Sequence, residues 1–426
     1  PFVDLPAERP VDIGIAPGDS ESAADTLANF TATLDSTQAY TIVANGVLSP
    51  GDFAPNPDGR DIAFELFIAE NAQEAAADEE SVSFRGVHGS TDAPTVDIIS
   101  AAGPTLLDDI TYGDISGYLT TSPSPTVVTV APGSGDAPPV AAFSVDLTGT
   151  GGAAFTILAS GFLNPADNQD GPGFTLIAAF ADGNVVELNA LPFPQDVAVN
   201  INQSFGDATD QSNYILAGLP GQVDLPVANT LEGTNPDNWR VFWDNGASGV
   251  DQGLVEFDGT DTFNFRPGRG FWMLAENPWT VSQTFSAVAL NPDGTASLPL
   301  HSGWNIISNP FGTAVPWAAV QAVNGASQDL WQWSGSFSTS ASFASAQNGQ
   351  AFYFLNDQGL DELRVPFFLP PSASAALASK SDEDTQALTL TAYAGDERAS
   401  AVRAGFATSA AAGKDDIDQF APPSYF

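Results

Sequence analysis

The chain has 426 residues, of which 52 are Asp or Glu and 11 are Lys or Arg, so its formal net charge at pH 7 is −41. A charge of this size repels nucleic acids and anionic membrane surfaces, which excludes a nucleic-acid partner. The chain has no cysteine, which excludes disulfides, thiolate metal sites and a cysteine nucleophile.

Glycine and proline are frequent, with 39 and 32 residues, and they separate short segments of alternating apolar and polar residues. This pattern predicts an all-β fold of tandem antiparallel β-sandwich domains with short helical turns. No stretch reaches the ~18 apolar residues of a membrane span, and we expect no membrane insertion. The first ten residues lack the basic and apolar regions of a signal peptide, so an exported protein would already have lost it.

Two segments near the start of the chain resemble each other, one from Ile15 and one from Val130, at an offset of 115 residues. The matching positions include Tyr40 with Phe155, Gly46 with Gly161 and Leu48 with Leu163. The second copy is preceded by a strand-rich block, residues 81–129, that the first copy lacks. A sandwich without its first strands exposes sheet edges. Two partners are therefore open: a cleaved upstream fragment that completes the first copy, or a neighbouring copy of the chain that donates strands.

The extra block carries Arg85, His88, Ser90 and the run Asp92-Ala93-Pro94, followed by GDISGYL at 113–119 and TVVTVAPG at 126–133. In these motifs the chain resembles the bacterial family called domain of unknown function 4397, over residues 10–190 with the first copy partial. The resemblance implies a surface-associated β-sandwich of unknown function, and no active site comes with it.

A second duplication, at an offset of 90 residues, begins after residue 196. It pairs Pro220 with Pro310, Pro226 with Pro316 and Trp243 with Trp333. Each half has a strand, a proline turn, a short helical segment and two aromatic strands, which predicts one pseudo-symmetric β domain. The segment GWNIISNPF at 303–311 and the tail at 388–420 resemble parts of secreted Bacteroidota-type surface proteins exported by type nine secretion. That resemblance implies an extracellular or cell-surface location.

The predicted organisation has five parts. These are a partial β-sandwich at 1–80, a complete β-sandwich at 81–195, a duplicated Trp-rich β domain at 196–370, a linker at 371–386 and a C-terminal β segment at 387–426.

Catalysis has little support in the sequence. Only His88 and His301 are available as general bases of the usual kind, and neither lies beside a nucleophile motif. We expect His88 to be structural and His301, which precedes a glycine turn, to be exposed. The sequence therefore predicts that the protein is not an enzyme.

Two groups of residues are candidates for ligand binding. Carboxylates at calcium-like spacing occur at Asp58, Asp61, Asp167, Asp170, Asp258 and Asp261. Ordinary turn chemistry uses the same residues, and no other cofactor is expected. Trp331 and Trp333 point to the same face of a strand and could stack on surface glycans, although packing inside the domain also explains them.

These observations favour a non-enzymatic structural component of an extracellular assembly: a filament, surface layer or matrix. The alternative is a carbohydrate-binding adhesin module that uses exposed Trp side chains of residues 196–370. A third interpretation is an accessory region of a larger secreted hydrolase.

Overall fold

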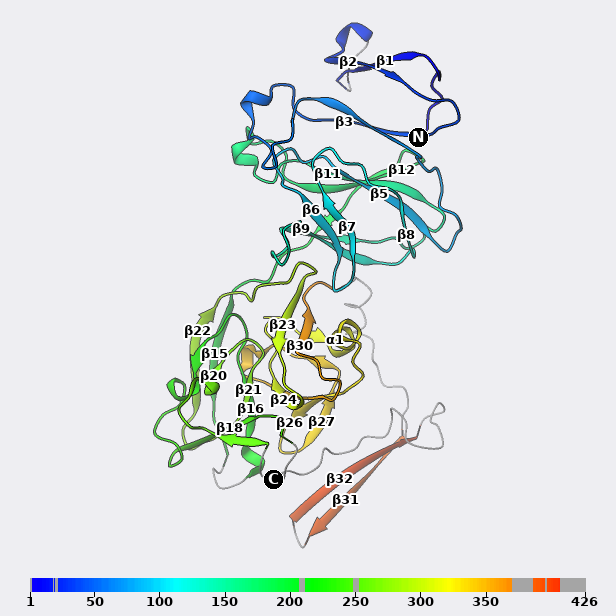
Figure 1. Cartoon of the computed structure of the whole chain (residues 1–426). Coiled ribbons are helices and arrows are strands. Elements are labelled where there is room, and N and C mark those ends of the chain that lie inside the picture. The colour runs from blue at the N-terminus through cyan, green and yellow to red at the C-terminus, as the bar shows by residue number, and fades with distance from the viewer. Residues whose placement is uncertain are drawn as a thin grey trace. The chain divides into compact units, whose positions relative to one another are not determined.

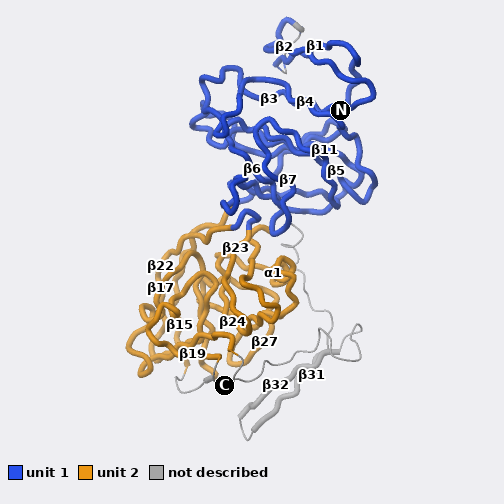
Figure 2. The backbone as a smooth tube through the Cα atoms, in the orientation of Figure 1, with its two compact units in different colours: residues 1–192, 291–294 blue, residues 193–290, 295–426 orange. Residues whose placement is uncertain are grey.

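The computed structural model describes residues 2–17, 19, 22–206, 211–247 and 253–369, together with two strands between 386 and 406. The chain divides into two compact units, shown in blue and orange in Figure 2. Unit 1 contains residues 1–192 and 291–294, and unit 2 contains residues 193–290 and 295–426. Strands dominate both units, which confirms the predicted all-β class.

The second repeat of unit 1 is a β-sandwich of two five-stranded sheets. The first sheet has the order β13 (Val185–Glu187), β12 (Thr175–Phe180), β11 (Ala154–Ser160), β5 (Val82–His88), β8 (Leu119–Thr121). The second has the order β14 (Asn189–Ala190), β10 (Ala141–Val145), β9 (Thr126–Pro132), β6 (Val96–Ser100), β7 (Thr105–Ile110). Apolar side chains at alternate positions of both sheets form the core between them, among them Phe84, Val128 and Phe143.

The first repeat has four strands: β1 (Pro10–Ile15), β2 (Ala28–Thr33), β3 (Tyr40–Asn45) and β4 (Glu65–Glu70). Strand β1 pairs with β2 as β9 pairs with β10, and β3 pairs with β4 as β11 pairs with β12. The 3-10 helices η2 (Pro50–Asp52) and η3 (Pro165–Asp167) follow β3 and β11 at the same offset of 115 residues. In the described residues, the first repeat has no counterpart of β5 to β8.

The strands of unit 1 form successive layers (Figure 1). The hairpin of β3 and β4 lies between β1 and β2 on one side and the sheet that contains β5 and β11 on the other. Val43 and Phe67 of the hairpin pack with Tyr112 and Phe162 of the second repeat. Every residue of β5 is buried. One face of β5 is therefore covered by the sandwich core, and the other by the hairpin of β3 and β4.

Unit 2 contains two successive sets of elements with the same order. The first set is β15 (Val197–Gln203), β16 (Ile215–Gly218), β17 (Leu225–Pro226), η5 (Val227–Asn229), β18 (Trp239–Asp244), β19 (Leu254–Glu256), β20 (Asn264–Phe265), β21 (Gly270–Ala275), β22 (Trp279–Phe285). The second set is β23 (Thr295–Pro299), β24 (Gly303–Ile307), β25 (Val315–Pro316), α1 (Trp317–Asn324), β26 (Leu330–Trp333), β27 (Phe337–Ser340), β28 (Ser342–Phe343), β29 (Phe352–Asn356), β30 (Glu362–Pro366). The remaining 3-10 helices among the described residues are η1 (Ala23–Asp25), η4 (Gln211–Asn213), η6 (Asp261–Phe263) and η7 (Ala346–Asn348).

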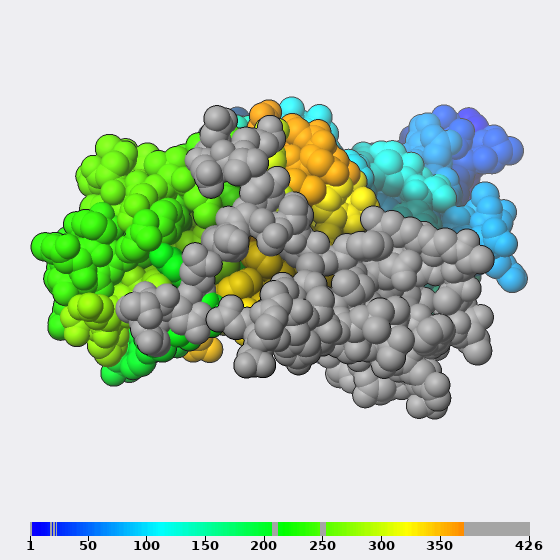
Figure 3. All heavy atoms as spheres, turned by 90° about the horizontal axis from the view of Figure 1, so that it is seen from below, coloured from blue at the N-terminus to red at the C-terminus, as the bar shows by residue number. Residues whose placement is uncertain are grey.

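Each set forms a four-stranded sheet, β16-β21-β18-β19 in the first and β24-β29-β26-β27 in the second. Two-stranded sheets pair β15 with β22, β17 with β20, β23 with β30 and β25 with β28. The two sets share a core cluster that includes Trp272 of β21 and Tyr353 of β29. Figure 3 shows their atoms, in green and in yellow to orange, lying against each other. Helix α1 follows Pro316 and ends at Asn324, before Gly325, whose φ of 60° suits glycine.

Beyond residue 369 the structure describes one hairpin, in which β31 (Gln386–Ala394) pairs with β32 (Glu397–Phe406). The predicted linker at 371–386 lies outside the described residues except for its last position, as do residues 407–426. Among the helices that the structure describes, none is long and apolar enough to cross a membrane.

Candidate functional site

The residues of the Arg-His-Ser-Asp motif lie where the two repeats of unit 1 meet. Arg85 of β5 is 4% exposed. Its guanidinium donates hydrogen bonds to Thr41 Oγ1 (3.2 Å) and to the carbonyl oxygen of Glu70 (3.2 Å), and it lies over the Tyr118 ring, 4.5 Å from the centroid. Arg85 therefore fastens the hairpin of β3 and β4 to the second repeat.

His88 is enclosed in the sandwich at the end of β5. Its Nε2 donates to the carbonyl oxygen of Pro94 at 3.0 Å, and its ring lies edge-on to Tyr112. Burial lowers the pKa of His88 below its ordinary value, so the imidazole is neutral at pH 7. His88 Nδ1 has no hydrogen-bond partner among the described residues.

Asp92 follows β5 and binds the loop after β11. Its carboxylate accepts hydrogen bonds from the backbone N–H groups of Leu163 and Asn164 and from Asn168 Nδ2, each at 2.8 Å. Ser90 donates to the carbonyl oxygen of Gly161 at 2.7 Å. His88 thus holds the turn at Pro94, while Ser90 and Asp92 both hold the loop that begins at Gly161, and the three side chains do not form a Ser-His-Asp relay.

The Arg85 contacts predict a local effect on stability. Arg85→Ala is expected to lower the free energy of unfolding of unit 1 by about 2 kcal/mol, because it removes two hydrogen bonds and the packed side-chain stem. Hydrogen exchange should quicken mainly in β3 and β4. Arg60, half-exposed and 3.8 Å from Asp114, is the matched control, and Arg60→Ala should cost less than about 1 kcal/mol. Equal losses in both variants would contradict the fastening role.

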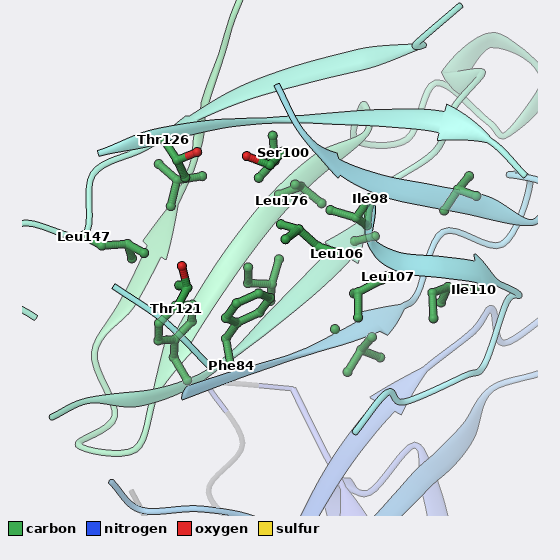
Figure 4. Close-up of a pocket in the computed structure, with 18 of the residues that line it drawn as sticks. Phe84, Ile98, Ser100, Leu106, Leu107, Ile110, Thr121, Thr126, Leu147 and Leu176 are labelled. Carbon is green, nitrogen blue, oxygen red and sulfur yellow. The ribbon is translucent and has the colours of Figure 1, made fainter. Parts of the chain in front are cut away.

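A cavity of about 260 Å³ lies between the two sheets of the complete sandwich. Figure 4 shows Phe84, Leu106 and Leu176 pointing into it, with the hydroxyls of Thr121 and Thr126 toward one end. The lining is mostly apolar, and His88 is the titratable side chain among the residues that line it.

The more distinctive feature of unit 1 is a pair of open strand edges in the first repeat. In the second repeat β11 pairs with β12 on one side and with β5, in parallel, on the other; β9 pairs with β10 and β6. Among the described residues, their counterparts β3 and β1 each have only one neighbour, β4 and β2. The carbonyl oxygen of Ala159 in β11 accepts a hydrogen bond from the N–H of Gly89, which follows β5, so the backbone groups of Ala159 point toward β5. Ala44 is the equivalent residue of β3, and its backbone groups therefore point to the open edge of β3.

The interior of the first repeat is correspondingly uncovered. Ala178 of β12 is 5% exposed, whereas the equivalent Ile68 of β4 is 43% exposed. Phe143 of β10 is 1% exposed, whereas the equivalent Phe30 of β2 is only half-buried. Among the described residues, the first repeat therefore has four strands of a sandwich and an apolar face that no further described strand covers.

Each of the six candidate calcium ligands makes a contact within its own unit. Asp58 accepts from the N–H and Oγ1 of Thr95, and Asp258 accepts from the N–H and Oγ1 of Thr260. Asp61 accepts from the N–H of Ala63, Asp167 accepts from Asn164 Nδ2, Asp170 donates its N–H to Pro165 O, and Asp261 pairs with Arg266. The part of the chain that the structure describes contains no group of three or more His, Asp or Glu side chains placed to hold a metal ion. Most of these contacts are local turn contacts, whereas Asp58 binds Thr95, 37 residues away, and Asp261 forms an ion pair; calcium binding stays a prediction.

The two candidate glycan-stacking residues are half-buried in the aromatic cluster of unit 2. Trp333 lies edge-on to Trp272, with ring centroids 5.3 Å apart, and also contacts Phe337. Trp331 packs against the same cluster. Both rings thus contribute to packing between the two sets of strands.

One expectation about histidine was wrong. His301 is half-buried, because its Nε2 donates to the carbonyl oxygen of Asp244 at 2.8 Å and its ring lies edge-on to Trp243. The loop before Gly303 turns the ring back onto β18.

A contact that sequence reasoning missed connects the two repeats. Asn56 Nδ2 donates to the carbonyl oxygens of Thr91 and Ala93, at 2.9 and 3.0 Å, within the Asp-Ala-Pro turn. The run NPDG at 56–59 resembles any polar turn, so its sequence carries no signal for this role.

Comparison with known families bears on the second repeat. Residues 82–180 match the family model Domain of unknown function (DUF4397). This match spans β5 to β12 and confirms the resemblance seen in the Arg-His-Ser-Asp motif. No curated protein and no solved structure matches the chain.

Proposed function

We propose that this chain is a non-enzymatic structural component of an extracellular assembly. In this assembly the β-sandwich domains act as rigid spacers, and the first repeat forms the contact with the next subunit. The observation that supports the proposal is the pair of open edges on β1 and β3 beside an uncovered apolar face. Unpaired strand edges are templates for pairing with another polypeptide.

The rest of the molecule is consistent with such a role. The side chains of the Arg-His-Ser-Asp motif hold backbone segments together, and the two His residues bind carbonyl oxygens. The net charge of −41 keeps the chain soluble and disfavours nonspecific contact between copies. The extracellular location rests on the resemblance of residues 303–311 and 388–420 to exported surface proteins.

The open edge of β3 gives a direct test. Ala44→Pro removes an N–H from that edge while the hydrogen bonds between β3 and β4 remain, because proline is tolerated where the N–H faces away from the ladder. Electron microscopy of extracellular material, with the chain immunolabelled, should show regular filaments or sheets that contain the wild-type chain and lack Ala44→Pro.

Ala44→Thr is the matched control, since it changes the side chain and keeps the N–H; this variant should enter the assemblies. Two outcomes would show that the edge of β3 does not form the contact between subunits. One is that wild-type chains are dispersed as monomers, and the other is that Ala44→Pro enters the assemblies at the wild-type level.

A further inference from the structure

The core of the second repeat is not fully packed. Protein interiors rarely contain voids larger than a water molecule, yet a cavity of about 260 Å³ lies between the two sheets, against β5, β6 and β7. An apolar cavity of ~150 Å³ holds a benzene molecule, so this one has room for roughly ten non-hydrogen atoms. An empty space of this size destabilises a core, and an apolar ligand that fills it would restore the lost contacts.

The cavity has the proportions of one hydrocarbon chain. Phe84, Gly86 and His88 lie on the same face of β5 and all line it. Its lining therefore extends ~13 Å along that strand, at ~3.3 Å per residue. A space of about 260 Å³ with this length is roughly 4–5 Å across. Because packed carbon atoms are ~4 Å apart, this width suits a single aliphatic chain.

The cavity opens to solvent where β8 ends. Thr121, Ser122 and Ser124 line it and are exposed, and the half-buried Thr126 begins β9 beside them. Figure 4 shows the hydroxyls of Thr121 and Thr126 at this end of the cavity and Ile110 at the opposite end. A ligand can therefore enter without separation of the two sheets.

His88 supplies a hydrogen-bond acceptor at the inner end. Thr121 pairs with Val82 at one end of β5, and His88 is at the other end, where it is 2% exposed. Because Nε2 of the neutral ring donates to the carbonyl oxygen of Pro94, Nδ1 is an acceptor. Nδ1 has no hydrogen-bond partner among the described residues. A buried acceptor without a donor is unfavourable, so a ligand hydroxyl that donates to Nδ1 would be stabilised there.

The lining also restricts the charge of the ligand. None of the described residues that line the cavity is Lys, Arg, Asp or Glu, so a charged head group would have no partner inside it. The net charge of −41 further disfavours an anion such as a fatty-acid carboxylate. We propose that the cavity binds an uncharged aliphatic alcohol of about ten carbons, whose hydroxyl donates to His88 Nδ1. This binding site is independent of the proposed structural function.

Calorimetric titration of the full-length chain tests the ligand class. We expect decanol to bind about tenfold more tightly than nonyl methyl ether, which has as many non-hydrogen atoms but cannot donate a hydrogen bond. Decanoate should bind more weakly than decanol, because its carboxylate would be buried without a cation. Equal affinity for the alcohol and the ether, tighter binding of decanoate, or no binding of decanol would overturn the proposal.

The histidine rings give a second readout. The chain has two histidines, so nitrogen NMR of the histidine-labelled chain resolves His88 with His301 of unit 2 as an internal control. Decanol should shift the Nδ1 resonance of His88 in the direction that marks an accepted hydrogen bond and leave His301 unchanged. Nonyl methyl ether should not produce this shift. Decanol that binds without moving the Nδ1 resonance would contradict the assigned hydrogen bond.

A variant that fills the cavity completes the test. Leu106 points into the cavity, so Leu106→Phe should abolish decanol binding (Figure 4). Val140→Phe is the matched control, because Val140 is 44% exposed in the same sandwich and does not line the cavity; this variant should bind as the wild type does. A folded Leu106→Phe chain with wild-type affinity would place the ligand elsewhere and sink the proposal. If circular dichroism shows that Leu106→Phe does not fold, the ligand series on the wild-type chain still decides.

Discussion

Asp92→Ala is expected to lower the free energy of unfolding of unit 1 by about 4 kcal/mol. The carboxylate is 9% exposed and accepts three hydrogen bonds of 2.8 Å, two of them from the backbone N–H groups of Leu163 and Asn164. Hydrogen bonds to a charged group contribute roughly 1.5–3 kcal/mol each, and the substitution leaves their donors without an acceptor. Chemical denaturation followed by circular dichroism measures the loss.

Asp136→Ala is the matched control, because Asp136 is an exposed carboxylate of the same sandwich. It should change stability by less than about 0.5 kcal/mol. Asp92→Asn keeps one acceptor oxygen and should fall between the two. A loss below about 1 kcal/mol in Asp92→Ala would mean that the loop after β11 does not depend on this carboxylate.

Tyr353→Phe is expected to destabilise unit 2 by roughly 3 kcal/mol at pH 7. Tyr353 donates from its hydroxyl to Asp244 Oδ2 at 2.8 Å and accepts from Trp272 Nε1 at 2.9 Å, and all three residues are buried. Burial raises the pKa of Tyr353 well above its ordinary value, so the hydroxyl keeps its proton. The phenylalanine leaves a buried carboxylate and an indole N–H without this partner.

The loss in Tyr353→Phe should depend on pH. Burial raises the pKa of Asp244 above its ordinary value of 3.8, while the hydrogen bond from Tyr353 opposes that rise. A raised folded-state pKa gives stability that is full below pH 3.8 and lost as the pH rises through the folded-state pKa. Without Tyr353 the pKa of Asp244 rises further, so the deficit of the variant should be larger at pH 7 than at pH 4.

Thermal unfolding of both chains at the two pH values checks this dependence. Tyr214→Phe, which removes a hydroxyl from the same aromatic cluster but not from the Asp244 contact, is the control and should show no such trend. A deficit in Tyr353→Phe that is constant with pH would argue that Asp244 is already protonated at neutral pH.

The two repeats of unit 1 could be predicted from the sequence, because residues that match between the copies lie where the backbone conformation allows few amino acids. Gly46 and Gly161 both have positive φ, 99° and 77°. A Cβ on either glycine would lie within 2.5 Å of the carbonyl oxygen of Ala63 or Gly173. Only glycine fits such a turn, so the two copies keep it and an alignment finds it.

The contacts between repeats were not predictable in the same way. Arg85 lies in the motif by which the chain resembles the matched family, but nothing in its neighbourhood in the sequence indicates that Thr41 and Glu70 receive its hydrogen bonds. Asp244 was one carboxylate among 52 Asp and Glu residues, and only burial beside Tyr353 distinguishes it. Partners that are far apart in the sequence meet only through packing, which alternation and spacing do not encode.

The open edge of β3 also has a thermodynamic consequence. Any strand that adds to the folded edge and not to the unfolded chain stabilises the first repeat by mass action, by about 2.7 kcal/mol when its concentration is a hundred times its dissociation constant. If such a strand binds, the melting temperature of the first repeat rises with the concentration of that strand. The second repeat contains its own β5, so its sheet needs no added strand.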